Sequence, residues 1–417
     1  MPLSASEKLF LSLIRGCICG GFDDSACESG YLSALTDGDT LSGLFTLAAE
    51  QKLLPVMYEG AVISGGFPEK FISSLRSAAI SQVVSETRRG ESFSAIYSHI
   101  ISRGLHPLVV KGRLCAALYP NPEARISSDD DILIPEDEFA RCLDELLALG
   151  LTIDEPKKNI NSAYEISLSG AESLGNVHIE LHRRLFDPAD KVFGGFNRFF
   201  DGVHERRSEY RDTAFLPMPP DEHLLYLILH AYKHFALRGV GVRQFCDIGL
   251  WAREYRGVIG WERLASSCRE ARAEVFAAAV FDIARTHLGI AVPDDVFPLS
   301  GDVSSLPLLC DSLSGGIYGS NSSERLHSST VTLDALGSSR GGRGRRSLMR
   351  SVFPPLEYMR GSYTYLEKHP ALLPFSWFAR LFRYGCEITR AGKPSSAAES
   401  VKLGRERTEL LRLYGII

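Results

Sequence analysis

The sequence predicts an α+β fold, with a small mixed β-sheet core flanked by N-terminal and C-terminal helical domains. Three observations support this prediction. Apolar residues recur at three- and four-residue spacing over residues 1–100 and again over about 216–300, as in helices packed on a core. Between these regions lie short apolar runs with the length of strands. Helix-like and strand-like runs alternate there, which favours a mixed sheet with helices on one face.

We expect four parts: an N-terminal helical domain (1–100), a core (101–215), a second helical domain (216–300), and an irregular connection with a C-terminal helical region (301–417). A chain of 417 residues with 45% hydrophobic content is long enough for two or three domains. The irregular connection is predicted from a stretch rich in Pro, Gly, Ser and Asp over 292–330.

Charge and cysteine content narrow the classes of protein to which the chain can belong. The net charge of −5 provides no global basic field of the kind that dominates nucleic-acid binding. The nine cysteines are scattered in apolar surroundings, which predicts reduced thiols in a cytoplasmic protein, with a metal site at Cys17, Cys19 and Cys27 as an alternative. No targeting signal is convincing and no run reaches the roughly eighteen apolar residues of a membrane span, so we expect no membrane partner.

In the N-terminal region we expect helices over residues 8–14, 41–50 and 69–100. Asp39 or Thr40 is a suitable N-cap for the second helix, because a short polar side chain can accept a hydrogen bond from a first-turn N–H group. No residue of this region is assigned a chemical role.

In the core we expect strands at 108–110, 132–134, 164–168 and 177–181, and helices at 113–119 and from 135 to 149. The second helix has acidic residues in its predicted first turn, which suits the helix dipole, and ends at Gly150. The last two strands are joined through a turn over 170–176.

Beyond the core, a helix follows Pro219 and Pro220 with Asp221 as a plausible cap. His230 and His234 lie one turn apart on this helix. Their spacing suits zinc, but no Glu stands where a zinc protease needs one, so structural or substrate-contacting roles are favoured. The final region is expected to form helices with a core of aromatic residues, namely Tyr363, Tyr365, Phe375, Trp377, Phe378 and Phe382.

Acidic side chains are concentrated where the strand at 132–134 begins. On an extended strand successive side chains alternate faces, so Asp129 and Asp131 point one way and Asp130 the other. The polar face of the strand near 177–182 carries His178, Glu180 and His182. Three acidic oxygen donors on adjacent strands form a typical Mg²⁺ site with positions left for substrate phosphates.

The sequence around these carboxylates contains VVKG at 109–112, RISSDDDILI at 125–134 and IELHRRL at 179–185. These words resemble an uncharacterised nucleotidyltransferase family with the pattern LKG…SDIDLLV…ELHWRL, a branch of the DNA polymerase beta-like nucleotidyltransferases. The resemblance extends to 44–48 and 54–58 in the N-terminal part and to 352–355 near the C-terminus. It implies that the region after residue 216 covers the active site, with Arg243 and Asp247 near it or joined in an i,i+4 ion pair.

The resemblance implies a Mg²⁺-dependent (or Mn²⁺-dependent) transfer of a nucleoside monophosphate from an NTP to a hydroxyl acceptor, with release of pyrophosphate. Asp129, Asp131 and Glu180 are then the metal ligands and catalytic residues, and Glu180 also serves as general base. The expected nucleotide- and phosphate-binding residues are Lys111, Gly112, Arg125, Ser127, Ser128, Arg243 and Asp247, with Arg125 alternatively bracing its loop. The acceptor is not identified.

Two positions depart from the family pattern. Asp130 stands where the family has an apolar residue, and its carboxylate would face the packed side of the sheet, which destabilises the fold unless the group is paired. On this ground Asp130→Ile is expected to hold or raise the melting temperature. Arg183 replaces an aromatic residue after the ELH word, so the shape of the acceptor side differs.

Two other functions stay open. One is a nucleotide-binding protein of the same fold without turnover, against which the three intact carboxylates argue. The other is an RNA- or tRNA-directed nucleotidyltransferase of toxin-like type, supported only by the arginine- and glycine-rich run at 340–346. That run is alternatively a solvated loop.

Overall fold

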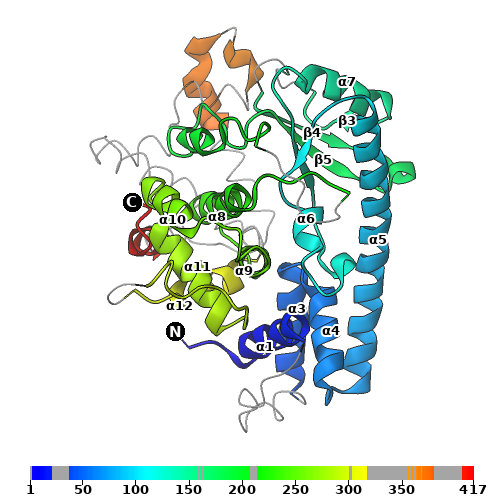
Figure 1. The fold of residues 1–417 in the computed structure, drawn as a ribbon, viewed down its shortest axis with the longest axis vertical. Coiled ribbons are helices and arrows are strands. Elements are labelled where there is room, and N and C mark those ends of the chain that lie inside the picture. The colour runs from blue at the N-terminus through cyan, green and yellow to red at the C-terminus, as the bar shows by residue number, and fades with distance from the viewer. Residues whose placement is uncertain are drawn as a thin grey trace.

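The computed structural model describes residues 2–20, 37–156, 163–206, 214–299, 303–316, 363–367, 369–379 and 406–417, with single residues at 160, 356 and 359. The fold is α+β, as predicted: a mixed five-stranded sheet surrounded by many helices (Figure 1). The arginine-rich run at 340–346 and the segment 352–355 lie outside the described residues.

The sheet has the strand order β1-β2-β5-β4-β3. Its strands are β1 (Leu108–Val109), β2 (Asp130–Leu133), β3 (Thr152–Ile153), β4 (Glu165–Ser169) and β5 (His178–His182). Strand β2 pairs with β5 in parallel, and the other neighbours are antiparallel. The register places Asp131 opposite Glu180. The two strands that carry the predicted metal ligands are therefore hydrogen-bonded neighbours.

The helices are α1 (Ala5–Cys19), α3 (Gly38–Glu50), α4 (Leu54–Ser64), α5 (Glu69–Ser102), α6 (Arg113–Ala116), α7 (Phe139–Ala148), α8 (Pro220–Leu237), α9 (Val242–Glu254), α10 (Trp261–Glu270), α11 (Glu274–Thr286) and α12 (Leu306–Gly315). Short 3₁₀ turns occur at Pro122–Ala124, Glu172–Leu174, Gly194–Phe200, Thr364–Glu367 and Pro370–Leu372. Helix α1 begins at a capping box between Ser4 and Glu7, which satisfies first-turn N–H groups.

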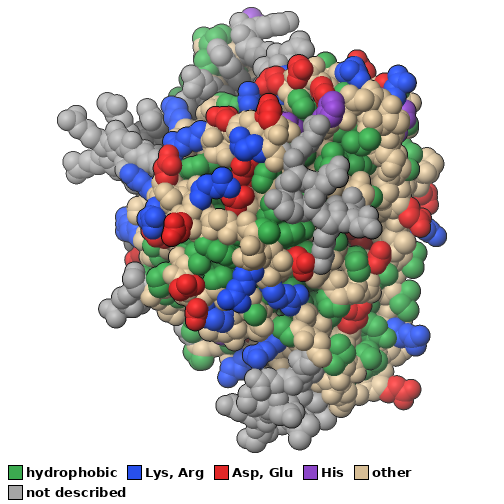
Figure 2. All heavy atoms as spheres, viewed as in Figure 1, with side chains coloured by type: hydrophobic (Ala, Val, Ile, Leu, Met, Phe, Trp, Pro, Cys, Tyr) green, Lys and Arg blue, Asp and Glu red, His purple; other side chains and the backbone are tan. Residues whose placement is uncertain are grey.

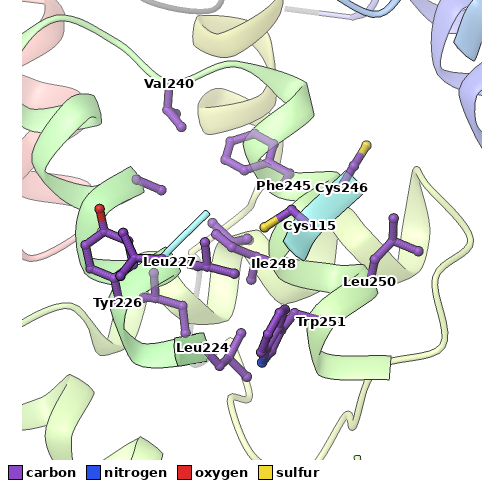
Figure 3. Close-up of a cluster of buried hydrophobic side chains, with 14 of the residues drawn as sticks. Cys115, Leu224, Tyr226, Leu227, Val240, Phe245, Cys246, Ile248, Leu250 and Trp251 are labelled. Carbon is purple, nitrogen blue, oxygen red and sulfur yellow. The ribbon is translucent and has the colours of Figure 1, made fainter. Parts of the chain in front are cut away.

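Helices lie on both sides of the sheet. The long helix α5 runs along one side of the molecule and continues past the sheet to α1, α3 and α4, while α8 to α11 lie on the other side (Figure 1). Helices α8 and α9 form a hydrophobic cluster that includes Cys115 of α6, so they are anchored directly to the core (Figure 3). This packing holds α8 over the sheet face that carries the predicted site.

Several local predictions are wrong. The N-cap of α3 is Asp37, whose side chain accepts a hydrogen bond from the backbone N–H of Thr40 at 2.9 Å, and neither Asp39 nor Thr40 caps the helix. Asp221 lies inside the first turn of α8 and pairs with Arg263 instead of capping. The acidic residues expected in the first turn of α7 precede that helix, which begins at Phe139. The predicted strands and long helices are otherwise present within a few residues.

Two C-terminal predictions also differ from the structure. Helix α12 lies within the segment expected to be irregular, because Leu308 and Leu309 pack into the core. Phe375 and Phe378, expected in a core, are 70% and 68% exposed. Tyr365 is also exposed, and Phe382 is outside the described residues.

The surface and the thiols agree with the composition. On the face shown in Figure 2, Lys and Arg side chains are interspersed with Asp and Glu side chains and do not form one basic field. None of the described cysteines forms a disulfide bond, and Cys17 donates a hydrogen bond to Glu59. Among the described residues, no helix combines the length and the apolar character needed to cross a membrane.

Candidate metal and nucleotide site

The loop before β2 is shaped by a close approach to Gly112. This glycine follows β1 with a positive φ of 61°, a conformation that other residues rarely adopt. A Cβ atom at this position would lie 2.8 Å from Oδ1 of Asp130. The glycine of the VVKG word is therefore needed for backbone conformation and for space, which brings Lys111 next to the acidic loop.

The predicted carboxylates converge, as strand alternation requires. Nζ of Lys111 lies 3.2 Å from Oδ2 of Asp129 and 3.0 Å from Oδ1 of Asp131. Asp131 is buried opposite Glu180 in the strand register. In this arrangement Lys111 supplies the positive charge between the two aspartates.

His182 joins the acidic group from the end of β5. Its Nε2 lies 3.2 Å from Oδ1 of Asp131 and 3.5 Å from Oε2 of Glu180, and its Nδ1 lies 3.6 Å from Oε2 of Glu165. Burial alone would lower the pKa of His182, but its hydrogen bonds to Asp131 and Glu180 outweigh burial and raise the pKa to about 9. The imidazole therefore carries a positive charge at neutral pH.

The two aspartates differ in the direction in which their pKa is shifted. Burial raises the pKa of Asp131 to about 6, although Lys111 opposes this. Asp129 is also penalised by burial, but the nearby Lys111 and Arg243 cations hold its pKa below the ordinary value. The pKa of Glu180 is lowered as well, because its interactions with His182 and Lys111 outweigh burial. The cluster therefore holds anionic charge that nearby cations stabilise.

The donor set fits a divalent metal ion. Asp131, Glu180 and His182 each offer one ligand atom, and these atoms lie within 4.8 Å of one another. Oδ2 of Asp131 is buried and makes no hydrogen bond, so an anionic oxygen is left for a cation to satisfy. Carboxylate oxygens suit Mg²⁺ and Mn²⁺, and an imidazole ligand is common for transition metals.

A cavity of about 660 Å³ opens in front of the cluster. Its size falls in the range typical of small-molecule sites. Asp129, Glu180 and His182 line it from the sheet side, and residues of α8, among them His230 and His234, also line it. Polar side chains of both charges line it, so the cavity suits a ligand with charged and uncharged parts.

A family model described as an uncharacterised nucleotidyltransferase matches residues 39–289, more than half of the chain. The chain belongs to this family. The matched region contains the VVKG, RISSDDDILI and IELHRRL words and the 44–48 and 54–58 segments, but it ends before 352–355. No curated protein and no solved structure matches the chain.

In this member of the family, Arg125 and Asp247 form a buried pair that braces the loop. Nε and Nη2 of Arg125 donate to Oδ1 and Oδ2 of Asp247 at 2.9 and 2.7 Å, and the hydroxyl of Tyr119 donates to Oδ1 at 2.9 Å. Arg243 donates to the carbonyl of Ile126, so it does not form the i,i+4 ion pair with Asp247 that the sequence allows. The geometry favours bracing by Arg125 and Asp247, and phosphate contact by these three residues stays a prediction.

The two serines before Asp129 have different surroundings. Ser127 donates from Oγ to the carbonyl of Asp129 at 2.9 Å, which fixes the turn into β2. Ser128 lines the cavity and accepts a hydrogen bond from Nζ of Lys52, a residue between α3 and α4. A phosphate role for either serine stays a prediction.

Asp130 points to the opposite face of the sheet, as predicted, and it is paired there. Its carboxylate accepts a hydrogen bond from Arg89 of α5 and lies 3.8 Å from Nε of Arg113. Glu86 pairs with both arginines, at 2.7 and 2.8 Å. Burial still raises the pKa of Asp130 to about 6. Arg183, the other departure, lies 3.8 Å over the ring of Phe139 and outside the cavity lining.

His230 and His234 line the cavity from α8. Their Nε2 atoms are 2.8 Å apart, so one neutral imidazole donates to the other. Burial lowers the pKa of both rings, that of His234 to about 3, which leaves them uncharged at neutral pH. Among the described residues, the only group of three side chains placed so that they could hold a metal ion is Asp131, Glu180 and His182, which does not include these two histidines. The structural or substrate-contacting role that the sequence favours over zinc stays a prediction.

Sequence reasoning missed Lys52 and Arg89, and it noted His182 without giving it a role. Lys52 and Arg89 lie in helical regions without a motif, and their contacts join residues 76 and 41 positions apart. A signal for His182 was present, because it shares the polar face of β5 with Glu180.

Proposed function

We propose that the protein is a Mg²⁺-dependent (or Mn²⁺-dependent) nucleotidyltransferase that moves a nucleoside monophosphate from an NTP to a hydroxyl acceptor. The observation that carries the proposal is the convergence of Asp129, Asp131 and Glu180 beside a cavity of about 660 Å³. In the reaction, the acceptor oxygen bonds to the α-phosphorus, the bond to the β-phosphate oxygen breaks, and pyrophosphate leaves.

Asp129 and Asp131 would hold one ion for the nucleotide phosphates and would share a second ion with Glu180 at the acceptor, and His182 could become a ligand only after losing its proton. Bound there, a divalent ion neutralises phosphate charge and makes a coordinated hydroxyl more acidic. Glu180 lines the cavity and, with its lowered pKa, is ionised at neutral pH, so it is available to accept the acceptor's proton. Once a metal ion balances the charge of the two aspartates, the ammonium group of Lys111 would be available to pair with the phosphates.

The first test is nucleotide binding. Wild-type protein is expected to show a rise in melting temperature with at least one of the four NTPs in the presence of Mg²⁺ or Mn²⁺, and no rise with the NTP in EDTA. The double variant Asp129→Asn/Asp131→Asn should lose this shift, because phosphates cannot approach bare carboxylates without a cation. The control is Asp144→Asn on the exposed side of α7. A wild-type shift in the double variant would place the metal site elsewhere.

The second test separates turnover from binding alone. A nucleotide-binding protein without catalysis would show the same thermal shift. Release of pyrophosphate, measured with a mixture of hydroxyl-bearing metabolites and followed by mass spectrometry of the modified acceptor, supports the transferase. Binding without any pyrophosphate under these conditions would favour the binding protein.

A further inference from the structure

The N-terminal helices contribute a charged group to the site. Lys52 lies in the turn between α3 and α4, and its Nζ donates a hydrogen bond to Oγ of Ser128. Ser128 directly precedes Asp129, and both line the cavity. A lysine from outside the sheet therefore reaches the loop that holds the candidate metal ligands.

The backbone at Lys52 is unusual for a lysine. Its φ is 54°, in the left-handed region that favours glycine. The N–H of Lys52 bonds to the carbonyl of Ala49, and the N–H of Leu53 bonds to the carbonyl of Ala48. This is the Schellman arrangement that ends a helix, and glycine is the usual residue at the position occupied by Lys52. Lys52 thus adopts a backbone conformation that is unfavourable for lysine, at a position from which its side chain reaches the site.

Three cations converge on four consecutive loop residues. Arg243 donates to the carbonyl of Ile126, Lys52 donates to Ser128, and Lys111 pairs with Asp129. Burial and the Arg243 guanidinium lower the pKa of Lys52, whereas Asp129 raises it. Positive groups that lie this close repel one another, and an anion bound beside them relieves the repulsion.

We propose that Lys52, together with Arg243, forms the subsite for the terminal phosphates of the substrate, so that the enzyme is selective for nucleoside triphosphates over monophosphates. This inference rests on the proposed nucleotidyl transfer. An NTP whose α-phosphate lies at Asp129 and Asp131 must extend its other phosphates along the site, and the loop at 126–128 carries the additional cations. The N-terminal helices then take part in substrate recognition.

The test uses the full chain, Mg²⁺, and three probes: inorganic tripolyphosphate, the NTP that gives the largest thermal shift, and the corresponding NMP. Lys52→Met is expected to weaken binding of tripolyphosphate and NTP by roughly 10- to 100-fold, as for loss of a hydrogen bond to a charged group. Binding of the NMP should change less than about twofold. Lys52→Arg should retain most of the NTP affinity, and Lys70→Met, an exposed change on α5, is the control.

The variant Lys52→Gly separates a loss of phosphate affinity from a loss of folded protein. Glycine relieves the left-handed backbone, so this variant should melt at or above the wild-type temperature while losing the same triphosphate affinity as Lys52→Met. Ser128→Ala tests whether Lys52 acts only by holding Ser128. If Ser128→Ala reproduces the loss, and the loss is equal for NMP and NTP, direct phosphate binding by Lys52 is ruled out.

The outcomes for the two proposals differ. If wild-type protein binds NTP with Mg²⁺ and the Lys52 variants bind it equally well, the phosphate subsite is wrong and the transferase proposal stands. If wild-type protein binds none of the NTPs and no tripolyphosphate, both are wrong.

Discussion

Strand β2 carries carboxylates on both of its faces, and the two faces compensate them differently. On the α5 face, Asp130 has a guanidinium facing each of its oxygens, from Arg89 and Arg113, and Glu86 pairs with both arginines. Two negative and two positive side chains balance there. That group does not line the cavity.

On the α8 face, three carboxylates form direct ion pairs with two cations, Lys111 and His182. Lys111 and His182 both approach Oδ1 of Asp131, and Oδ2 of this residue has no hydrogen-bond partner. Asp129 and Glu180 line the cavity. Burial raises the pKa of Asp130 and Asp131 to about 6 alike, so a perturbed carboxylate by itself does not indicate function. Asp130 likewise has one oxygen, Oδ1, without a hydrogen-bond partner, so the cavity and the excess of carboxylates over ion-paired cations distinguish the α8 face.

The largest expected difference between the faces is in the chemical step. Glu180→Gln should slow pyrophosphate release by about 10²- to 10⁴-fold, because the proposed general base is removed, while NTP affinity stays near wild type. The measurements are calorimetry with Mg²⁺ and a turnover assay with the identified acceptor. The control on the α5 face is Glu86→Gln, which should lower the melting temperature but change turnover only a few-fold. Loss of NTP binding in Glu180→Gln would mean that Glu180 belongs to the nucleotide's own metal site.

The next effect is on stability at the α5 face. Asp130→Ile should lower the free energy of unfolding by about 3–5 kcal/mol, because Arg89 and Arg113 then stay buried with one carboxylate fewer. The sequence alone predicts an unchanged or higher melting temperature, and the observed pairing reverses that expectation. Urea unfolding of the two proteins at pH 7.5 decides between them. A more stable Asp130→Ile protein would show that Arg89 and Arg113 find other partners.

The smallest predicted effect is a loss of stability at the α8 face that Mg²⁺ partly reverses. Lys111→Met removes the cation between Asp129 and Asp131, and it should destabilise the metal-free protein by about 1–3 kcal/mol. Mg²⁺ should restore much of this loss, so its effect on the melting temperature should exceed that in wild type.

The matched variant for this test is Arg89→Met, which removes a cation beside Asp130 on the same strand. Mg²⁺ should not rescue it, because the α5 face is closed by packing. Equal responses of the two variants to Mg²⁺ would remove the proposed distinction between the faces.

The core of the site could be predicted from the sequence because its determinants are local. Strand alternation fixes that Asp129 and Asp131 share a face and that Asp130 takes the other, whatever surrounds the strand. The same periodicity places Glu180 and His182 together on β5. The register of β2 against β5, which puts Asp131 opposite Glu180, then completes the group.

The sequence by itself determined the α+β class, four of the five strands and the face on which the carboxylates lie, because side-chain periodicity follows from backbone geometry over a few residues. Only the tertiary structure decided which charges pair. Asp247 pairs with Arg125 and not with Arg243. Arg89 pairs with Asp130, and Lys52 donates a hydrogen bond to Ser128. These partners are separated by 122, 41 and 76 positions, and no local pattern constrains contacts over such distances. They depend on how the helices pack around the sheet.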